Sequence, residues 1–245
     1  MGVELPFQNR EPEIEAIATT CLQNLRVSKL GAGEISQKKT TLLTTAQMWG
    51  SGKTWLGRHF LPQFRSQQYK TLRSKLEVEY GSDTVGILAN SVYIPIDLRR
   101  WMHMFIQLPP GRLDLYILRS LLGTILAYYP QDIDFWQNQP ESKWSPGSIL
   151  NWFKEKYNRS FFIHYDEVDY ILQVPPAILY DAAFEIEGAN RFYHFWTFIH
   201  SVTLTGNFLY ISGRSVFLYA FGKGLYRRPG LVSPGITVIV VGLLI

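Results

Sequence analysis

The first quarter of the chain changes from helical to strand-like spacing of its apolar residues and back again. Between Phe7 and Leu25 these residues fall three or four positions apart, which predicts an amphipathic helix opened near Pro12. Residues 28–39 show no periodicity and indicate a connector. A β-branched, apolar run at residues 40–48 then predicts a strand, and residues 55–69 return to roughly helical spacing.

Strand-like and helical stretches continue to alternate along the rest of the chain. Pro95 favours an edge position for the strand that contains it, Ser148 is the predicted cap of a short helix, and residues 130–146 indicate a Trp-bearing loop. Strands are predicted at residues 91–98, 161–165, 208–212 and 237–244, and helices at residues 113–128, 148–157, 177–187 and 190–202. Parallel strands need crossover connections, so this alternation predicts a three-layer α/β fold with a mainly parallel five-stranded sheet and helices on both faces.

Length and composition fit one folded domain of this kind. A chain of 245 residues with 47% hydrophobic and 18% charged residues lies in the range of globular proteins and buries a sizeable core. We divide it into an N-terminal helix and connector, residues 1–39, and a core, residues 40–245.

Charge, cysteine content and hydropathy exclude several classes. The formal charge of +4 permits weak attraction to nucleic acid or anionic lipid, but the basic residues are scattered and identify no partner by themselves. The single cysteine, Cys21, excludes an intrachain disulfide and a multi-cysteine metal cluster, and we expect it to be a small buried hydrophobe. The most apolar segment, residues 236–245, has about half the length of a membrane-spanning helix. With no secretory signal visible, we expect a soluble intracellular protein.

The strongest motif lies between the strand at residues 40–48 and the helix that follows it. The eight residues Gln47-Met48-Trp49-Gly50-Ser51-Gly52-Lys53-Thr54 match the phosphate-binding pattern G-x-x-x-x-G-K-[ST], with Gln47 in place of the first glycine. Small residues let successive backbone N–H groups converge on phosphate oxygens at the positive end of a helix dipole.

This match assigns roles to individual residues. Lys53 is expected to reach the β- and γ-phosphates, and the Thr54 hydroxyl is expected to bind Mg²⁺. Gly50, Ser51, Gly52 and Trp55 complete the predicted nucleotide-binding segment. The competing interpretation is a flexible Gly-Ser turn with a solvated lysine, and the position between strand and helix argues against it.

A second group of polar residues ends the hydrophobic strand at residues 161–165. Asp166 is expected to support the Mg²⁺ shell from a strand lying beside the strand of residues 40–48, and Glu167 to polarise the attacking water. The alternative is two solvated acids that cap a strand. Asp169 fits a helix start better than a ligand, and His164 fits a satisfied core histidine, so no zinc site is predicted.

The strand at residues 208–212 ends in the sequence Ser212-Gly213-Arg214-Ser215. Here the Ser212 hydroxyl is expected to orient the water, and Arg214 to offset charge on the γ-phosphate. A polar turn after a strand is the competing interpretation. Asp97, at the end of another predicted strand, fits a turn-forming aspartate.

Together these motifs and the opening residues Phe7-Gln8-Asn9-Arg10-Glu11 resemble the additional-strand catalytic-glutamate class of P-loop NTPases, in its AAA-like and STAND-like branches. Within that class they are most similar to the NTPase module of Crinkler effectors and retrotransposon hot spot proteins. The resemblance covers nearly the whole chain and implies the three-layer P-loop NTPase fold. It also implies that Arg10 lies near the nucleotide base, that Ser212 and Arg214 act as a γ-phosphate sensor, and that the helical lid of AAA proteins is missing after residue 245.

The function that we expect is Mg²⁺-dependent hydrolysis of the β–γ phosphoanhydride of a nucleoside triphosphate, expected to be ATP, coupled to a conformational change. Two alternatives stand beside it: a nucleotide-binding switch module with negligible turnover, and a P-loop kinase, against which the Asp166-Glu167 pair argues. The resemblance leaves an effector domain, a protein partner, nucleic acid and a homo-oligomer open as partners. It places the protein in the cytoplasm or nucleus, of a host cell if the protein is a secreted effector.

Overall fold

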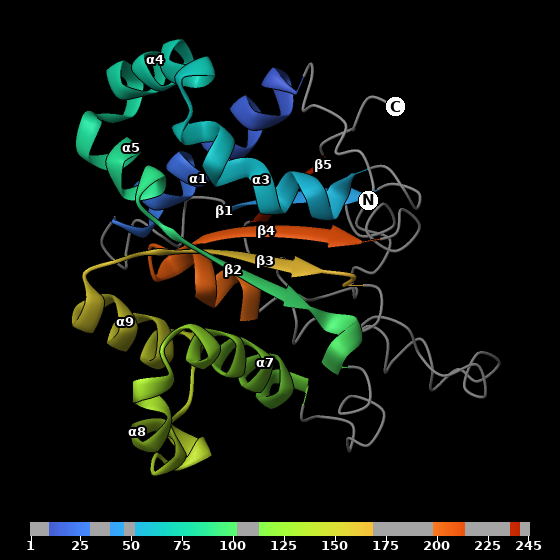
Figure 1. Ribbon diagram of the computed structural model, residues 1–245, viewed down its shortest axis with the longest axis vertical. Helices are drawn as coiled ribbons and strands as arrows, with labels where there is room; N and C mark the ends of the chain where they lie inside the picture. The colour runs from blue at the N-terminus through green and yellow to red at the C-terminus, as the bar shows by residue number, and fades with distance from the viewer. Residues whose placement is uncertain are drawn as a thin grey trace, which may run out of the picture.

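Five strands form one sheet in which every neighbouring pair is parallel (Figure 1). The computed structural model describes residues 10–29, 40–46, 52–101, 113–168, 198–213 and 236–240. The strands are β1 (Thr40–Ala46), β2 (Val92–Asp97), β3 (Phe161–Asp166), β4 (Phe208–Gly213) and β5 (Ile236–Val240), in the order β2-β3-β4-β1-β5. The predicted α/β fold and parallel sheet are therefore confirmed.

The position expected for the strand that carries Asp166 is wrong. β3 does not lie beside β1, because β4 stands between them and pairs with both. All six residues of β4 are buried, as a strand covered on both faces and flanked on both sides requires. The hydrophobic patterns of β3 and β4 are alike, so neither pattern reveals which strand is the neighbour of β1.

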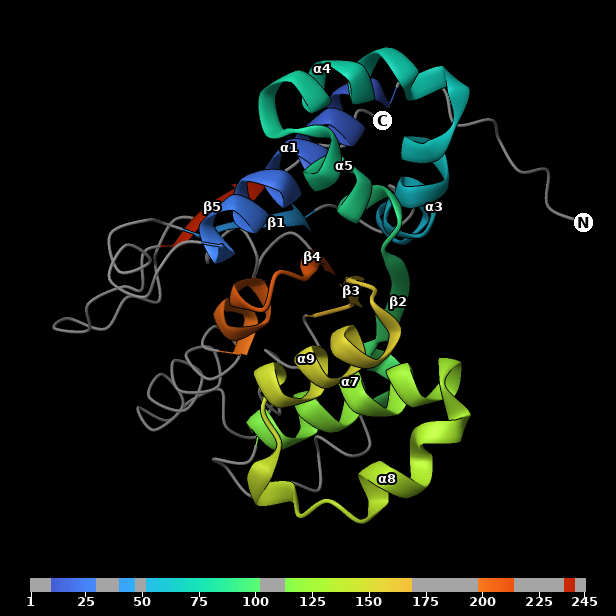
Figure 2. The same ribbon diagram turned by 90° about the vertical axis from the view of Figure 1, so that its left-hand side faces the viewer.

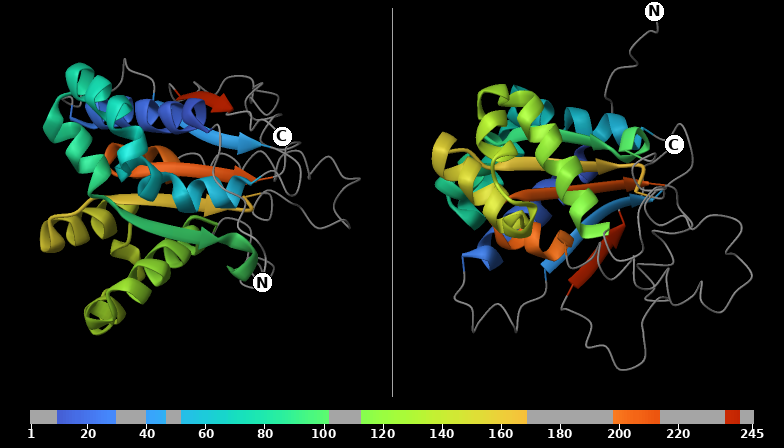
Figure 3. Two further views of the ribbon diagram at one scale, coloured as in Figure 1. Left: turned by 45° about the horizontal axis from the view of Figure 1, so that its top comes forward. Right: turned by 90° about the horizontal axis from the view of Figure 1, so that it is seen from below.

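Helices cover both faces of the sheet (Figure 2). One side carries α1 (Glu11–Ser28), α3 (Lys53–Arg65), α4 (Lys70–Tyr80) and α5 (Ser82–Ala89), and the other carries α7 (Leu113–Tyr128), α8 (Ile133–Gln137), α9 (Pro146–Tyr157) and a helical segment at residues 198–204. Short 3₁₀ turns lie at Gln67–Tyr69, Leu98–Trp101, Pro130–Asp132 and Glu141–Lys143. Figure 3 shows the two sides in turn. None of the helices in these ranges has the length and apolar character needed to cross a bilayer.

Alternating residues of β3 divide the core into two clusters. Phe161, Ile163 and Tyr165 pack against α7 and α9, whereas Phe162 packs with α1 and α3 on the opposite face. Successive side chains of a strand point to opposite faces, so one strand supplies both cores. His164 shares the face of Phe162 and is as buried as its apolar neighbours.

A buried amide joins α1 to the sheet. Asn24 donates through Nδ2 to the carbonyl of Thr41 at 2.7 Å and accepts through Oδ1 from the Thr41 N–H at 2.9 Å. The pairing of β1 with β4 begins only at Thr44. The Asn24 side chain therefore takes the place of a neighbouring strand at the beginning of β1, which satisfies two backbone groups that would otherwise be orphaned.

Pro95 lies on an edge strand, as predicted. The Val92 N–H donates to the Ser160 carbonyl, and bonding in a parallel ladder alternates, so Val92, Ile94 and Ile96 face β3. Tyr93, Pro95 and Asp97 then direct their backbone groups to the open edge. The N–H group that proline lacks would have pointed to the side without a partner strand, so no hydrogen bond between strands is lost.

The region from residue 130 to residue 157 differs from its prediction at two points. The predicted loop contains α8, whose Trp136 is buried in the core, so a helix too short to show periodicity was missed. The helix α9 begins at Pro146 and is capped by Ser145, which accepts from the Ser148 N–H at 2.9 Å. Ser148 is therefore the third residue of a capping box and not the cap, because its hydroxyl accepts from the Ser145 N–H.

Candidate functional site

The predicted phosphate-binding segment leads into the first turn of α3 at the carboxyl edge of the sheet (Figure 1). Gly52 caps the helix in the left-handed conformation, with φ 82°, and its carbonyl accepts from the Leu56 N–H at 2.8 Å. Glycine adopts this conformation without strain. The N–H groups of a first helical turn point out of the end of the helix, and together with the helix dipole they make this end of α3 attractive to an anion. Gly50, Ser51 and Gln47 lie outside the described residues.

Thr54 and Asp166 meet across 112 residues of sequence. The Thr54 hydroxyl donates to Asp166 Oδ2 at 2.6 Å, which joins the first turn of α3 to the end of β3. Asp166 Oδ1 also accepts from the Ser212 hydroxyl at 2.5 Å and from the Glu167 N–H at 3.0 Å. Three donors from three different elements or turns therefore converge on one buried carboxyl group.

A chain of hydrogen bonds fixes the direction of the Ser212 hydroxyl. Because Ser212 donates its one proton to Asp166, its Oγ must accept from His164 Nε2, 2.7 Å away. His164 Nδ1 is then the unprotonated nitrogen and accepts from the Tyr93 hydroxyl at 2.9 Å. Burial lowers the pKa of His164 to about 4, the nearby Asp166 opposes this shift, and Arg58 adds to it. The imidazole is therefore neutral at physiological pH, as this chain requires, and the prediction of a satisfied core histidine is confirmed.

Glu167 follows Asp166 in an unusual backbone conformation. Its φ is 57°, in the left-handed region, where residues other than glycine are rare. Its side chain is 13% exposed, and Oε1 lies 4.0 Å from the Arg99 guanidinium. Oε2 is buried and has no hydrogen-bond partner among the described residues. A carboxylate oxygen in this state is able to accept a proton or a hydrogen bond from a bound molecule.

A cavity of about 640 Å³ opens beside these groups. Its wall includes Thr54, Asp166 and His164 together with Arg58, Arg99 and Trp101. Arg99 binds Asp97 through two guanidinium contacts and its own N–H, each at 3.0 Å, so Asp97 is the predicted turn former. Burial favours a higher pKa for Asp97, but the hydrogen bonds from Arg99 outweigh it and the pKa is lowered.

Tyr210 and Gly57 lie where α3 packs against the sheet. The Tyr210 hydroxyl lies 2.7 Å from Thr45 Oγ1 and donates to the Lys53 carbonyl at 3.4 Å, which ties β1, β4 and α3 together. Lys53 itself is only 8% exposed. Gly57 lies directly over the His164 ring, where a Cβ atom would clash with it. The close approach of α3 to β3 therefore depends on glycine at this position.

The remaining predicted residues lie apart from this group or outside the described ranges. Arg10 precedes α1 and binds Glu13 at 3.0 Å, and its predicted place near a nucleotide base stays a prediction. Trp55 stacks on His59 with ring centroids 4.1 Å apart. Arg214 and Asp169 lie outside the described residues.

The roles of Tyr93 and Arg99 were not predicted from the sequence. Both act from the edge strand β2 or the turn after it, far along the chain from the motifs. Strand register is the feature that connects them to the site. It sets Asp97 opposite Asp166 and places the ends of β2 and β3 side by side.

Within the described ranges, no group of three or more His, Cys, Asp and Glu residues could hold a metal ion alone. The adjacent oxygens of Thr54 and Asp166 suit a hard cation such as Mg²⁺, which retains waters and takes further ligands from a phosphate. These residues therefore fit a metal ion that brings further ligands with it.

Comparison with known proteins leaves the family open. No protein-family model matches the chain, and a search of curated proteins found no match.

Proposed function

We propose that the protein is a P-loop nucleoside triphosphatase that binds a Mg²⁺-nucleoside triphosphate, with ATP as the expected nucleotide, at the first turn of α3. The observation that carries the proposal is the 2.6 Å contact between Thr54 and Asp166. This contact joins the ends of two sequence motifs, and both motifs were expected to bind the same metal ion. A chance Gly-Ser turn and a chance acidic strand end have no reason to meet in this way.

The order of the strands supports the same class. An additional strand between the strand before the phosphate-binding segment and the strand with the acidic pair is the feature from which the additional-strand class takes its name. In this chain β4 occupies that position. It also supplies Ser212, so the inserted strand delivers a hydroxyl group to Asp166.

The roles of the chain's residues follow from their positions. The N–H groups of the first turn of α3 and the ammonium group of Lys53 would bind the β- and γ-phosphates. Thr54 and Asp166 would hold the metal, which when bound supplies charge neutralisation at the β- and γ-phosphate oxygens. The Thr54 hydroxyl oxygen keeps two lone pairs while its proton is donated to Asp166, so it would bind the metal through a lone pair and retain this hydrogen bond.

Glu167 is the proposed general base. Its Oε2 is buried and has no hydrogen-bond partner among the described residues, which lowers the stability of the folded protein. Its positive φ destabilises the backbone by about 1–3 kcal/mol. Both features are common at functional sites. In the proposed reaction Oε2 accepts a proton from water, the water oxygen attacks the γ-phosphorus, and the bond to the β–γ bridging oxygen breaks. Ser212 and Arg214 keep their proposed role as γ-phosphate sensor.

One observation favours the alternative of a switch module with negligible turnover. Arg99 lies 4.0 Å from Glu167 Oε1, and an ion pair competes with water for a carboxylate. If Glu167 keeps this partner when nucleotide is bound, triphosphate binding would proceed without hydrolysis.

Phosphate release from Mg²⁺-ATP, measured for the wild type and for Glu167→Gln, distinguishes the triphosphatase from the switch module. Removing a general base while keeping the shape of the site should lower turnover by at least ~10²-fold and leave ATP binding intact. Glu155→Gln makes the same chemical change at an exposed position on α9 and should have no effect. Unchanged turnover in Glu167→Gln would remove Glu167 from this role, and a wild type that binds ATP without releasing phosphate would establish the switch module.

A further inference from the structure

A second, larger depression lies along the same edge strand. A groove of about 1220 Å³ runs over the beginning of β2, between α3 and α5 on one side and α7 and α9 on the other. This volume exceeds the roughly 300–1,000 Å³ of sites for small molecules. In Figure 1 β2 crosses the front of the molecule between these two layers.

Basic side chains from several elements line this groove. Arg58 and Arg65 enter from α3, Lys154 from α9, and Arg159 from the segment before β3. Among the described residues of its wall, the only acidic side chain is that of Asp83. Within the described part of the chain, none of the four cations forms an ion pair with a carboxylate.

Arg65 is held in the groove by backbone carbonyls and not by a carboxylate. Arg65 is fixed by donation to the carbonyls of Ala89 and Ser91. Burial and then the positive charge of Arg159 lower the pKa of Arg65. Two like charges this close create a positive potential that a bound anion would relieve.

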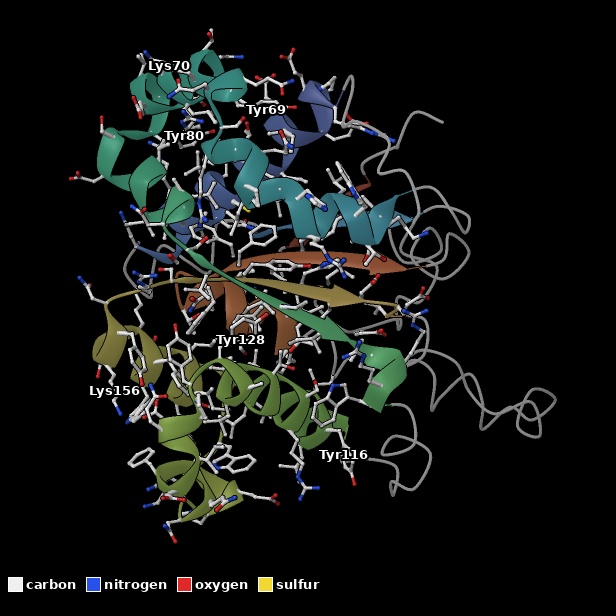
Figure 4. The ribbon with its side chains drawn as sticks, viewed as in Figure 1. Tyr69, Lys70, Tyr80, Tyr116, Tyr128 and Lys156 are labelled. Atoms are coloured by element: carbon white, nitrogen blue, oxygen red, sulfur yellow. The ribbon has the colours of Figure 1, made fainter. Side chains whose placement is uncertain are left out.

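An aromatic ring stands beside these charges. Tyr128, at the end of α7, lines the groove and is 49% exposed. Figure 4 shows it between α7 and the edge strand β2. A positive groove combined with an accessible aromatic ring is the combination that binds a single-stranded nucleic acid, through its phosphates and by stacking on its bases.

An extended acidic peptide fits this edge less well. A peptide bound beside a sheet edge is recognised mainly through backbone hydrogen bonds. Pro95, which lines the neighbouring cavity two residues beyond Tyr93, removes one of the outward N–H groups of β2 and so limits the pairing to the beginning of the strand. Arginine, by contrast, matches the geometry of phosphate.

We propose that the groove along β2 binds single-stranded nucleic acid, with Arg58, Arg65, Lys154 and Arg159 facing the phosphates and Tyr128 stacking on a base. Arg58 and Tyr93 line both this groove and the cavity beside Asp166. A bound strand would therefore reach the wall of the proposed nucleotide site. The proposal does not rest on nucleotide hydrolysis, because binding is measured without ATP or Mg²⁺.

Fluorescence anisotropy with a labelled oligothymidylate of about 12 nucleotides tests the proposal. Four phosphate contacts on a single strand predict a slope of about −3 for log affinity against log salt concentration. Arg159→Glu should weaken binding and bring this slope about one unit closer to zero. Lys70→Glu makes the same type of charge change on α4, far from the groove in Figure 4, and should leave the affinity and the slope unchanged.

Two further comparisons make the test specific. Tyr128→Ala should weaken binding by at least about fivefold, whereas Tyr128→Phe keeps the ring and should bind like the wild type. Binding should persist in Lys53→Ala, since the groove is separate from the predicted phosphate-binding segment. No binding by the wild type, or equal weakening in Arg159→Glu and Lys70→Glu, would overturn the proposal. The proposal would also be overturned if polyglutamate bound as tightly as the oligonucleotide and the Tyr128→Ala variant bound as tightly as the wild type. The partner would then be an acidic protein.

Discussion

Acidification should destabilise this protein through His164 in particular. Burial lowers the pKa of this residue from its ordinary value of 6.5 to about 4, so the unfolded chain takes up a proton at higher pH than the folded chain does. The stability contributed by the neutral imidazole is complete above pH 6.5 and falls as the pH decreases towards 4. A shift of this size corresponds to about 3 kcal/mol when fully developed, and to about 2 kcal/mol at pH 5.

Urea unfolding at about pH 7.5 and about pH 5 measures this loss when the wild type is compared with His164→Gln. The glutamine amide is neutral throughout and its N–H group can take the place of Nε2 beside Ser212. The variant shares every other titrating group, so the difference between the two losses isolates residue 164. The wild type should lose about 2 kcal/mol more than the variant over this interval. Equal losses would refute the conclusion that a neutral histidine supports Ser212.

Three substitutions test other parts of the site. Lys53→Ala should weaken binding of labelled ATP on the order of a hundredfold, because it removes a charge-assisted contact to phosphate; unchanged affinity would contradict the phosphate-binding segment. Arg214→Ala should weaken ATP binding more than tenfold and leave ADP binding almost unchanged; equal weakening would indicate a structural or β-phosphate role. Gly57→Ala should lower the unfolding free energy by roughly 1–2 kcal/mol, since the clash with His164 exceeds the gain in helix propensity. In Gly86→Ala the new methyl group meets open space and stability should not fall, so equal losses in the two variants would exclude the clash as the cause.

Features set by local pattern could be predicted from the sequence. The helix at residues 113–128 has the predicted bounds because its apolar spacing is long and regular. The end of β3 could be located because an apolar run stops abruptly at Asp166 and Glu167, and carboxyl ends of parallel strands meet at one edge of the sheet.

Features set by pairing could not be predicted. The chain of hydrogen bonds from Tyr93 to Asp166 depends on β2, β3 and β4 lying side by side in one register. Single-strand hydrophobicity carries no information on that order, and the expected neighbour of β1 was wrong for this reason. The positive φ of Glu167 likewise follows from tertiary contacts and not from a glycine that the sequence would reveal.

The central position of β4 has a consequence for how the chain folds. Both strands that pair with β1 come from residues after 207, and Thr44 lies 167 positions before its partner Ile211 (211 minus 44). During synthesis, β2 and β3 can pair while β1 still waits for a neighbour, with Asn24 of α1 covering only its first backbone groups. Contacts so distant in sequence are slow to form, because the loop must close before the contact stabilises it. Joining β1 to the finished β2-β3 pair through β4 is thus the expected slow step of folding, and the exposed strand in the preceding intermediate is its point of vulnerability to aggregation.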